Sequence, residues 1–177
     1  MLVILSILVL LIIAIFAFLH VPKLGKLPSG ARLERIKQSK NYKNGQFQNL
    51  SETPMITAEG GMITVLKQFL FDKKIRVNPV DIIPSAKTDL LNLEAAKDIL
   101  VWFGHSSYFM QIDGKKILVD PVFSGAASPF SFSIKAFKGT DVYTTEDIPQ
   151  IDYLFISHDH WDHLDYETVL KLKPKIK

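Results

Sequence analysis

The feature that most constrains the fold of this chain is the hexapeptide His158-Asp159-His160-Trp161-Asp162-His163, which fits the pattern H-x-H-x-D-H. Residues 151–157 before it are rich in β-branched and aromatic side chains, which predicts a buried strand. Residues 165–172 after it predict a helix, with Asp165 as the N-cap and Glu167 in the first turn. A loop between the carboxyl end of a strand and a helix is where α/β sheets usually build their sites. The hexapeptide therefore predicts an α/β fold with a functional site at one edge of the sheet.

The spacing of the histidines and aspartates predicts a site for two metal ions. His158 and His160 are two residues apart, so in an extended segment both side chains leave the same side of the backbone. Two neutral imidazoles that converge suit Zn²⁺ or a similar ion. Asp162 and His163 are adjacent and diverge, so they can hold a second ion about 3.5–4 Å from the first, as in two-metal hydrolases. The alternative is a histidine-rich surface loop.

Three further polar residues are candidates for supporting the metal ligands. Asp159 either orients a ligand imidazole or is a solvated loop carboxylate. His105 follows a short apolar strand and is either a hydrogen-bonded structural residue or part of the site. Asp120 is either a turn carboxylate at a strand end or a hydrogen-bond partner of a metal-bound histidine. Between His105 and Asp120, two apolar runs flank Asp113-Gly114, which predicts a β-hairpin.

In these segments the chain resembles the metallo-β-lactamase fold superfamily, whose members carry H-x-H-x-D-H at this point. The similarity is strongest to the branch that contains N-acyl-phosphatidylethanolamine phospholipase D and its bacterial relatives. It covers about residues 32–177, and the segments that carry it are 42–50, 102–107, 112–123 and 127–130. The resemblance implies an αβ/βα sandwich, of which this α/β chain supplies the N-terminal half.

The resemblance also implies roles for individual residues. His158 and His160 would ligate one divalent metal ion, Asp162 and His163 would ligate the other, and zinc is the expected metal. Asp162 would in addition hold the attacking water in place as the catalytic residue. In the family, a third histidine, a bridging carboxylate and a further histidine follow the hexapeptide, whereas no histidine follows His163 here. We therefore expect either a fragment of a longer protein or a truncated product with an incomplete site.

The N-terminus predicts a membrane anchor. Residues 2–19 are uncharged and apolar except for Ser6, and the run approaches the length of about 20 residues that spans a bilayer. A cleaved signal peptide is the alternative, but no Lys or Arg precedes the run and no small-x-small cleavage site follows it. We expect a retained single-pass anchor over residues 1–20.

The segment after this anchor is strongly basic. Seven Lys and Arg residues lie from Lys23 to Lys43 against Glu34 alone, a charge of +6, whereas the rest of the chain sums to −3. The positive-inside rule then places the catalytic part in the cytoplasm, and the cations can attract anionic lipid head groups. The alternative is a solvated linker. A nucleic-acid partner is not expected, because the rest of the chain is mildly acidic and has no reading motif.

The predicted organisation is an anchor (1–20), a basic linker with an N-terminal extension (21–60) and an incomplete metallo-β-lactamase-like domain (61–177). Apolar residues at helical spacing over 62–70 predict a helix that packs on the fold, with a lipid-contacting face as the alternative. The chain has no cysteine, which excludes disulfides and thiolate ligands, so a metal has to be held by His, Asp and Glu.

Together these features predict a membrane-anchored, metal-dependent hydrolase that acts on a phosphodiester or a phospholipid-like ester. Two metal ions would lower the pKa of a bridging water and stabilise the charge that develops on the substrate oxygens. A lactonase, a β-lactamase or a nuclease of the same fold is the alternative, and a catalytically inactive, truncated membrane protein is another. The expected partners are membrane lipid and a small-molecule or phospholipid ester, and the sequence makes no prediction of oligomeric state.

Overall fold

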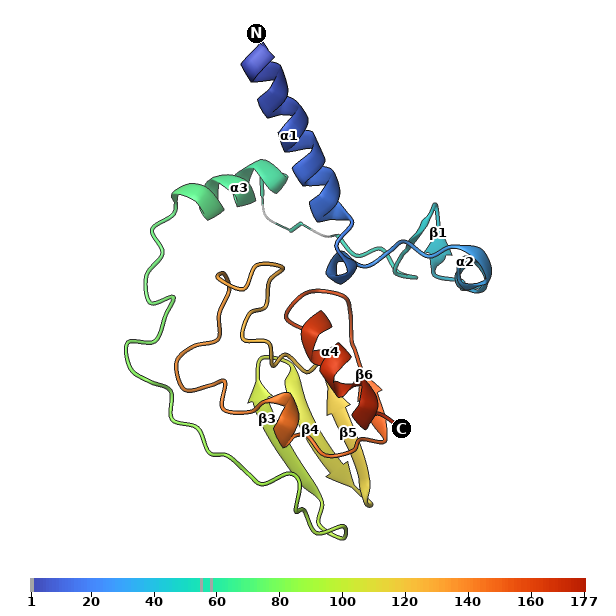
Figure 1. The fold of residues 1–177 in the computed structure, drawn as a ribbon, viewed down its shortest axis with the longest axis vertical. Coiled ribbons are helices and arrows are strands. Elements are labelled where there is room, and N and C mark those ends of the chain that lie inside the picture. Colours follow the sequence, from blue (N-terminus) through green and yellow to red (C-terminus); the bar gives the residue numbers. More distant parts are fainter. Residues whose placement is uncertain (1, 55, 58) are drawn as a thin grey trace. The chain divides into compact units, whose positions relative to one another are not determined.

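The computed structural model describes residues 2–54, 56–57 and 59–177 (Figure 1). These residues divide into two compact units. One unit comprises the chain up to Leu24 together with Asn78–Lys177, and the other comprises Gly25–Val77. These divisions differ from the predicted domain boundaries at residues 20 and 60, which stay predictions.

Helix α1 (Leu2–Leu19) follows the apolar N-terminal run, and none of its residues is buried. Among the described residues it is the one helix long and apolar enough to cross a membrane, with a mean hydropathy of 3.5. Its place near the N-terminus suits a signal sequence as well as an anchor.

The larger unit is built on a four-stranded sheet in the order β3-β4-β5-β6. Its strands are β3 (Ile99–Gly104), β4 (Ser107–Ile112), β5 (Lys115–Val119) and β6 (Tyr153–Phe155). The first three strands are antiparallel, and β6 pairs with β5 in parallel. The predicted hairpin is confirmed, because Asp113 and Gly114 join β4 to β5 with φ of 48° and 72°, as two-residue hairpin turns require.

A long excursion of the chain separates β5 from β6 and contains the short 3₁₀ helix η2 (Thr145–Asp147). The buried strand predicted over 151–157 is shorter in the structure, and it is not buried, because Tyr153 and Phe155 are exposed. Ile151 forms only an isolated bridge with Ile176. At the other end, the Ser157 amide donates to the side chain of Asp120 instead of to a neighbouring strand.

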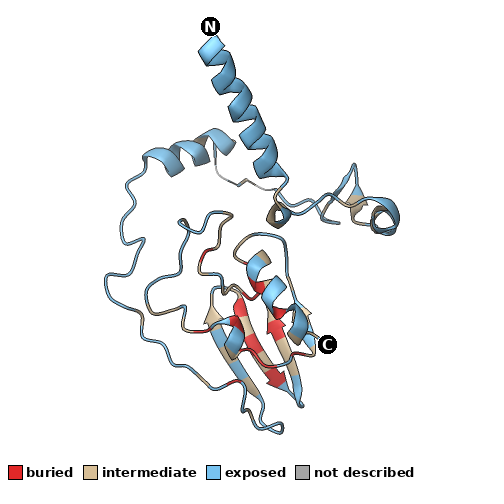
Figure 2. Ribbon diagram, viewed as in Figure 1, coloured by how far each residue is buried: buried red, intermediate tan, exposed pale blue. Residues whose placement is uncertain are grey.

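One face of the sheet forms the hydrophobic core with helix α4 (Tyr166–Leu172) and the adjoining loops. The buried residues gather on β4, β5 and α4 (Figure 2), and Leu172 lies in one cluster with Phe109 and Leu118. The predicted helix and its N-cap are confirmed, because the Asp165 side chain accepts a hydrogen bond from the Thr168 amide. The 3₁₀ helix η3 (Lys173–Lys175) follows α4 directly.

The opposite face of the sheet is apolar and exposed. Two cross-strand rows occupy it, with the residues Leu100, Met110, Ile117 and Tyr153 in one and Trp102, Tyr108, Val119 and Phe155 in the other. The four residues on the outer strands are 51–68% exposed. Successive strand residues point to opposite faces, so this surface is a direct consequence of the register that builds the core.

The unit Gly25–Val77 contains α2 (Gly30–Lys37), a small hairpin of β1 (Tyr42–Lys43) and β2 (Gln46–Phe47), and α3 (Gly61–Phe71). The helix predicted over 62–70 is therefore present. None of its residues is buried, so the predicted packing of this helix on the fold is not observed.

Candidate metal centre

Three strands bring the candidate residues to one edge of the sheet. Strands β3, β5 and β6 run in the same direction, because β3 and β5 are both antiparallel to β4 and β6 is parallel to β5. Their carboxyl ends therefore lie at the same edge. His105 follows β3, Asp120 follows β5, and the hexapeptide 158–163 follows β6. This edge is where α/β folds usually place their functional groups.

The buried centre of the site is the pair of Asp120 and His163. The Nδ1 atom of His163 lies 2.8 Å from Oδ2 of Asp120, and the two side chains are 11% and 2% exposed. The Asp120 carboxylate also accepts hydrogen bonds from the amide and the hydroxyl of Ser157, each at 2.7 Å. The backbone amide of Asp120 donates to Phe155 at 2.9 Å, which ties the ends of β5 and β6 together.

The Asp120 carboxylate is held in its ionised form. Burial raises the pKa of this carboxyl, but hydrogen bonds from His163 and Ser157 outweigh burial, so the pKa lies below its usual value of 3.8. Because the Nδ1 atom of His163 faces this carboxylate, we assign the imidazole proton to Nδ1. The Nε2 lone pair of His163 then faces Nε2 of His105 at 3.3 Å and is positioned to bind a metal, in the carboxylate–histidine arrangement common in metal sites.

Ser157 orients a second histidine, His158, in a similar way. Its hydroxyl donates to Asp120, and its oxygen lies 3.0 Å from Nδ1 of His158 and 3.1 Å from Nδ1 of His163. A hydroxyl whose proton is already used can still accept, so the Nδ1–H of His158 can donate to it. This arrangement also leaves Nε2 of His158 free as a ligand atom.

Three potential ligand atoms, from His105, Asp162 and His163, all lie within 4.8 Å of one another. Nε2 of His105 is 3.0 Å from Oδ2 of Asp162 and 3.3 Å from Nε2 of His163. The distance from Oδ2 of Asp162 to Nε2 of His163 is 3.8 Å. Two imidazoles and one carboxylate are ligands that Zn²⁺ and other divalent ions accept. The donor set therefore fits a divalent metal.

His158 and His160 lie next to this group. The ring of His158 is centred 3.8 Å from that of His163 and 4.6 Å from that of His160. Both side chains are exposed, and among the described residues neither belongs to the group of three with mutually close ligand atoms. Asp159, the other candidate in the hexapeptide, is also exposed.

The loop that carries these ligands is fixed at both ends. At its start, Ser157 binds Asp120. At its end, Asp165 is buried and caps α4, and its Oδ2 also accepts from the Ser124 amide at 2.9 Å. The turn that carries His105 is also held in place. His105 adopts a φ of 48° in the tight turn from β3 to β4, and its carbonyl accepts a hydrogen bond from the indole of Trp102 at 2.9 Å.

The grouping of the candidate residues in the structure differs from the predicted pairs of ligands. Asp120 contacts a predicted ligand, His163. His105, predicted only as a supporting residue, lies among the potential ligand atoms. Ser157 was not predicted, and its place directly before the hexapeptide was the only signal for it. The ligand roles of His158, His160, Asp162 and His163 and the catalytic role of Asp162 stay predictions.

Residues 99–176 match a family model described as a beta-lactamase superfamily domain. The chain is 33% identical over 135 residues to an uncharacterized protein of Mycobacterium tuberculosis, a match that covers 76% of this chain and 36% of that protein. It is 37% identical over 79 residues to N-acyl-phosphatidylethanolamine-hydrolyzing phospholipase D 1 of Caenorhabditis elegans, covering 43% of this chain and 22% of that enzyme. A metal-dependent hydrolase of Caldivirga maquilingensis is 32% identical over 65 residues, or 37% of this chain and 23% of that protein.

Among solved structures, CmlA, a diiron β-hydroxylase from Streptomyces venezuelae, is 31% identical, with a TM-score of 0.35 over 45% of this chain and 14% of that one. The chain spans about a third of the length of the mycobacterial relative, and less of the others. The matched family model, together with the sheet and helix that present the hexapeptide, leads to one assignment. Residues 99–176 of this chain belong to the beta-lactamase superfamily and form the N-terminal half of a metallo-β-lactamase fold.

Proposed function

We propose that this chain supplies the membrane-anchored, metal-binding half of a hydrolase that acts on a phosphodiester or a phospholipid-like ester. One observation carries the proposal: the buried Asp120–His163 pair presents an imidazole nitrogen beside Asp162 and His105. A buried carboxylate that fixes the tautomer of a histidine is a device of metal sites.

Two divalent ions, with zinc as the proposed metal, would be held by His158 and His160 and by Asp162 and His163. His105 is a further candidate ligand, because its Nε2 atom lies 3.0 Å from Asp162. Bound divalent ions of this kind supply Lewis acidity and make a bound water nucleophilic near neutral pH. The role of Asp162 is to position that water, and the roles of Asp120 and Ser157 are to orient the imidazoles.

Two observations support the substrate class and the membrane. The relative from Caenorhabditis elegans is named as a phospholipase, and α1 has the length and hydropathy of a membrane span. The same fold could equally serve a lactonase, a β-lactamase or a nuclease. A catalytically inactive, membrane-tethered protein is the alternative outside the enzymes.

The test is metal binding by the full chain in detergent, measured by elemental analysis and by competition with a chromophoric chelator. We expect at least about one equivalent of zinc or a similar ion, lost in the double variant His158→Ala/His163→Ala. The matched control is Asp159→Asn, which removes an exposed carboxylate from the same loop. Binding of less than about a tenth of an equivalent, or binding that the double variant retains, would contradict the proposal.

The substrate is tested separately. Vesicles that contain an N-acylated phospholipid are compared with a soluble phosphodiester, a lactone, a β-lactam and single-stranded DNA. Metal-dependent hydrolysis of the phospholipid alone supports the proposed substrate class. Hydrolysis of only one of the soluble compounds contradicts it and identifies the substrate class instead. Full metal occupancy without turnover of any of them supports the inactive alternative.

A further inference from the structure

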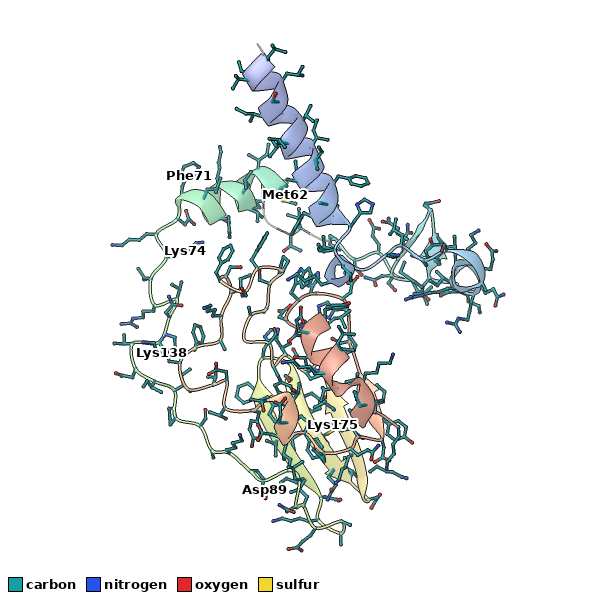
Figure 3. All side chains as sticks on the ribbon, in the orientation of Figure 1. Met62, Phe71, Lys74, Asp89, Lys138 and Lys175 are labelled. Atoms are coloured by element: carbon teal, nitrogen blue, oxygen red, sulfur yellow. The ribbon has the colours of Figure 1, made fainter. Side chains whose placement is uncertain are left out.

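Helix α3 has a complete apolar face that no described part of the chain buries. At 100° per residue, six apolar side chains fall within an arc of about 160°, a pattern typical of an amphipathic helix. They are Met62, Ile63, Val65, Leu66, Phe69 and Leu70, each 38–68% exposed. Thr64, Lys67 and Gln68 lie on the opposite side, together with Phe71 at the C-terminal end of the helix. Figure 3 shows these side chains, with Met62 and Phe71 at the two ends of the helix.

Cations lie on the polar side of α3 and after its C-terminal end. Lys67 lies on the polar side of α3, and Lys73, Lys74 and Arg76 follow its C-terminal end, against a single acidic residue, Asp72. The whole unit Gly25–Val77 carries ten Lys and Arg residues and four Asp and Glu residues, a net charge of +6. In contrast, Asn78–Lys177 carries ten Lys residues and fourteen Asp and Glu residues, a net charge of −4. The positive charge of this protein is therefore concentrated in the unit that bears the apolar helix.

One cation contacts a residue of the apolar face. The ammonium of Lys74 lies 4.3 Å from the centre of the Phe69 ring. The ring quadrupole attracts this cation, and the long apolar stem of a lysine lets its charge reach a membrane–water interface. A surface that packs against another protein is instead depleted of lysine.

The length of α3 excludes a second membrane span. Eleven residues make a helix of about 16 Å, roughly half of the hydrocarbon thickness of a bilayer. A short amphipathic helix with Phe and Leu on one side and Lys on the other lies in the plane of the interface, with its apolar face among the acyl chains.

We propose that α3 is an interfacial helix that inserts its apolar face into a bilayer containing anionic lipids, with Lys67, Lys73, Lys74 and Arg76 at the level of the head groups. This contact is separate from α1 and depends on neither the metal ions nor hydrolysis. Because the chain continues from Val77 into the sheet unit, an inserted α3 tethers that unit to the lipid surface.

The absence of cysteine gives a direct test, because any introduced cysteine is a unique labelling site. Single-cysteine variants of the full chain carry a fluorophore on the apolar face (Leu66→Cys or Phe69→Cys) or on the polar face (Thr64→Cys or Gln68→Cys) as matched controls. The labelled chains are reconstituted in phosphatidylcholine vesicles with about 30% phosphatidylglycerol. Aqueous iodide and lipid-borne nitroxides then report which face meets lipid. All four sites are unburied, so labelling leaves the core intact.

We expect labels at 66 and 69 to be quenched by the nitroxide lipids and to be at least about threefold less accessible to iodide than labels at 64 and 68. Equal iodide quenching on both faces overturns the proposal. So does shielding from iodide without nitroxide quenching, which shows that protein covers the face.

The charge requirement is tested with Lys73→Gln/Lys74→Gln/Arg76→Gln and with vesicles of phosphatidylcholine alone. Both changes should reduce the difference in iodide quenching between the apolar and the polar face, because each cation near an anionic surface strengthens membrane binding by about fivefold. A difference that stays the same in both cases overturns the assignment of anionic lipid. Metal content, measured in parallel, distinguishes failure here from failure of the proposed hydrolase.

Discussion

Replacing Asp120 by asparagine tests whether a buried carboxylate sets the metal-binding form of His163. Asparagine has nearly the same shape as aspartate, and its oxygen can still accept a hydrogen bond from the Ser157 amide, which lies 2.7 Å from Oδ1 of Asp120. Its other terminal group is a donor, however, and it would face Nδ1 of His163 at about the present 2.8 Å. To avoid two opposed donors, the imidazole has to move its proton from Nδ1 to Nε2. The lone pair then points at the asparagine instead of at the metal.

The expected magnitudes differ for metal binding and for stability. Loss of such a hydrogen-bond partner typically weakens metal affinity by about 10–100-fold. The free energy of unfolding should fall by only about 1–3 kcal/mol, because one hydrogen bond to a charged group is replaced by a neutral one. Asp120→Ala removes all three accepted hydrogen bonds. It should therefore lower the free energy of unfolding by about 3–5 kcal/mol in addition to weakening the metal site.

The assay is zinc competition against a chromophoric chelator, with thermal unfolding followed by circular dichroism on the same samples. Asp159→Asn is the control for charge, since it removes one carboxylate from the loop without touching His163. If Asp120→Asn binds zinc as tightly as Asp159→Asn, the carboxylate does not set the imidazole, and the reasoning from burial and hydrogen bonding is refuted.

Four further outcomes follow from the structure. Ser157→Ala should weaken zinc binding by about tenfold, because His158 and His163 lose a shared hydroxyl partner; an unchanged dissociation constant would show that the hydroxyl orients neither. Asp165→Ala should lower the free energy of unfolding by about 1–3 kcal/mol, since it removes a buried N-cap that also holds Ser124, whereas the exposed Glu167→Gln should change it by less than about 0.5 kcal/mol; equal effects would contradict the capping role. The hydrogen bond from Lys87 lowers the pKa of Asp147 below 3.8, despite partial burial. The ionised Asp147 carboxylate should therefore stabilise the fold above pH 3.8, and this stabilisation should be lost as the pH falls through the lower pKa of the folded state. Asp147→Asn should then reduce the melting temperature near pH 7 but not near pH 2, and a reduction of the same size at both would refute the linkage. The exposed apolar face of the sheet should make the chain self-associate, and Leu100→Thr/Phe155→Thr should reduce this association in analytical ultracentrifugation at nearly unchanged stability; a large loss of stability would show that this face is packed.

The part of the fold that is local in the chain could be predicted from the sequence. The Asp113-Gly114 turn and the Asp165 cap were recognisable because each depends on residues within a few positions of one another. The same holds for the strand, ligand loop and helix around the hexapeptide, although β6 is shorter than predicted. The fold family followed from the hexapeptide together with the segments upstream of it.

The site as a three-dimensional object could not be predicted in this way. Asp120 and His163 are 43 residues apart, and His105 and His163 are 58 apart, so only strand pairing decides that they meet. The sequence left Asp120 as an equal choice between a turn carboxylate and a ligand support, and it gave no weight to Ser157. For the helix over 62–70, periodicity predicted the helix correctly but could not say what its apolar face meets.

The sequence by itself therefore determined the ligand types, the strand–loop–helix that presents them, the charge contrast between the two units and the apolar N-terminal run. The tertiary structure decided which side chains share a site. The physical reason is the common direction of β3, β5 and β6, which places three carboxyl ends at one edge of the sheet. There, burial beside His163 turns Asp120 from a turn residue into the carboxylate that fixes an imidazole.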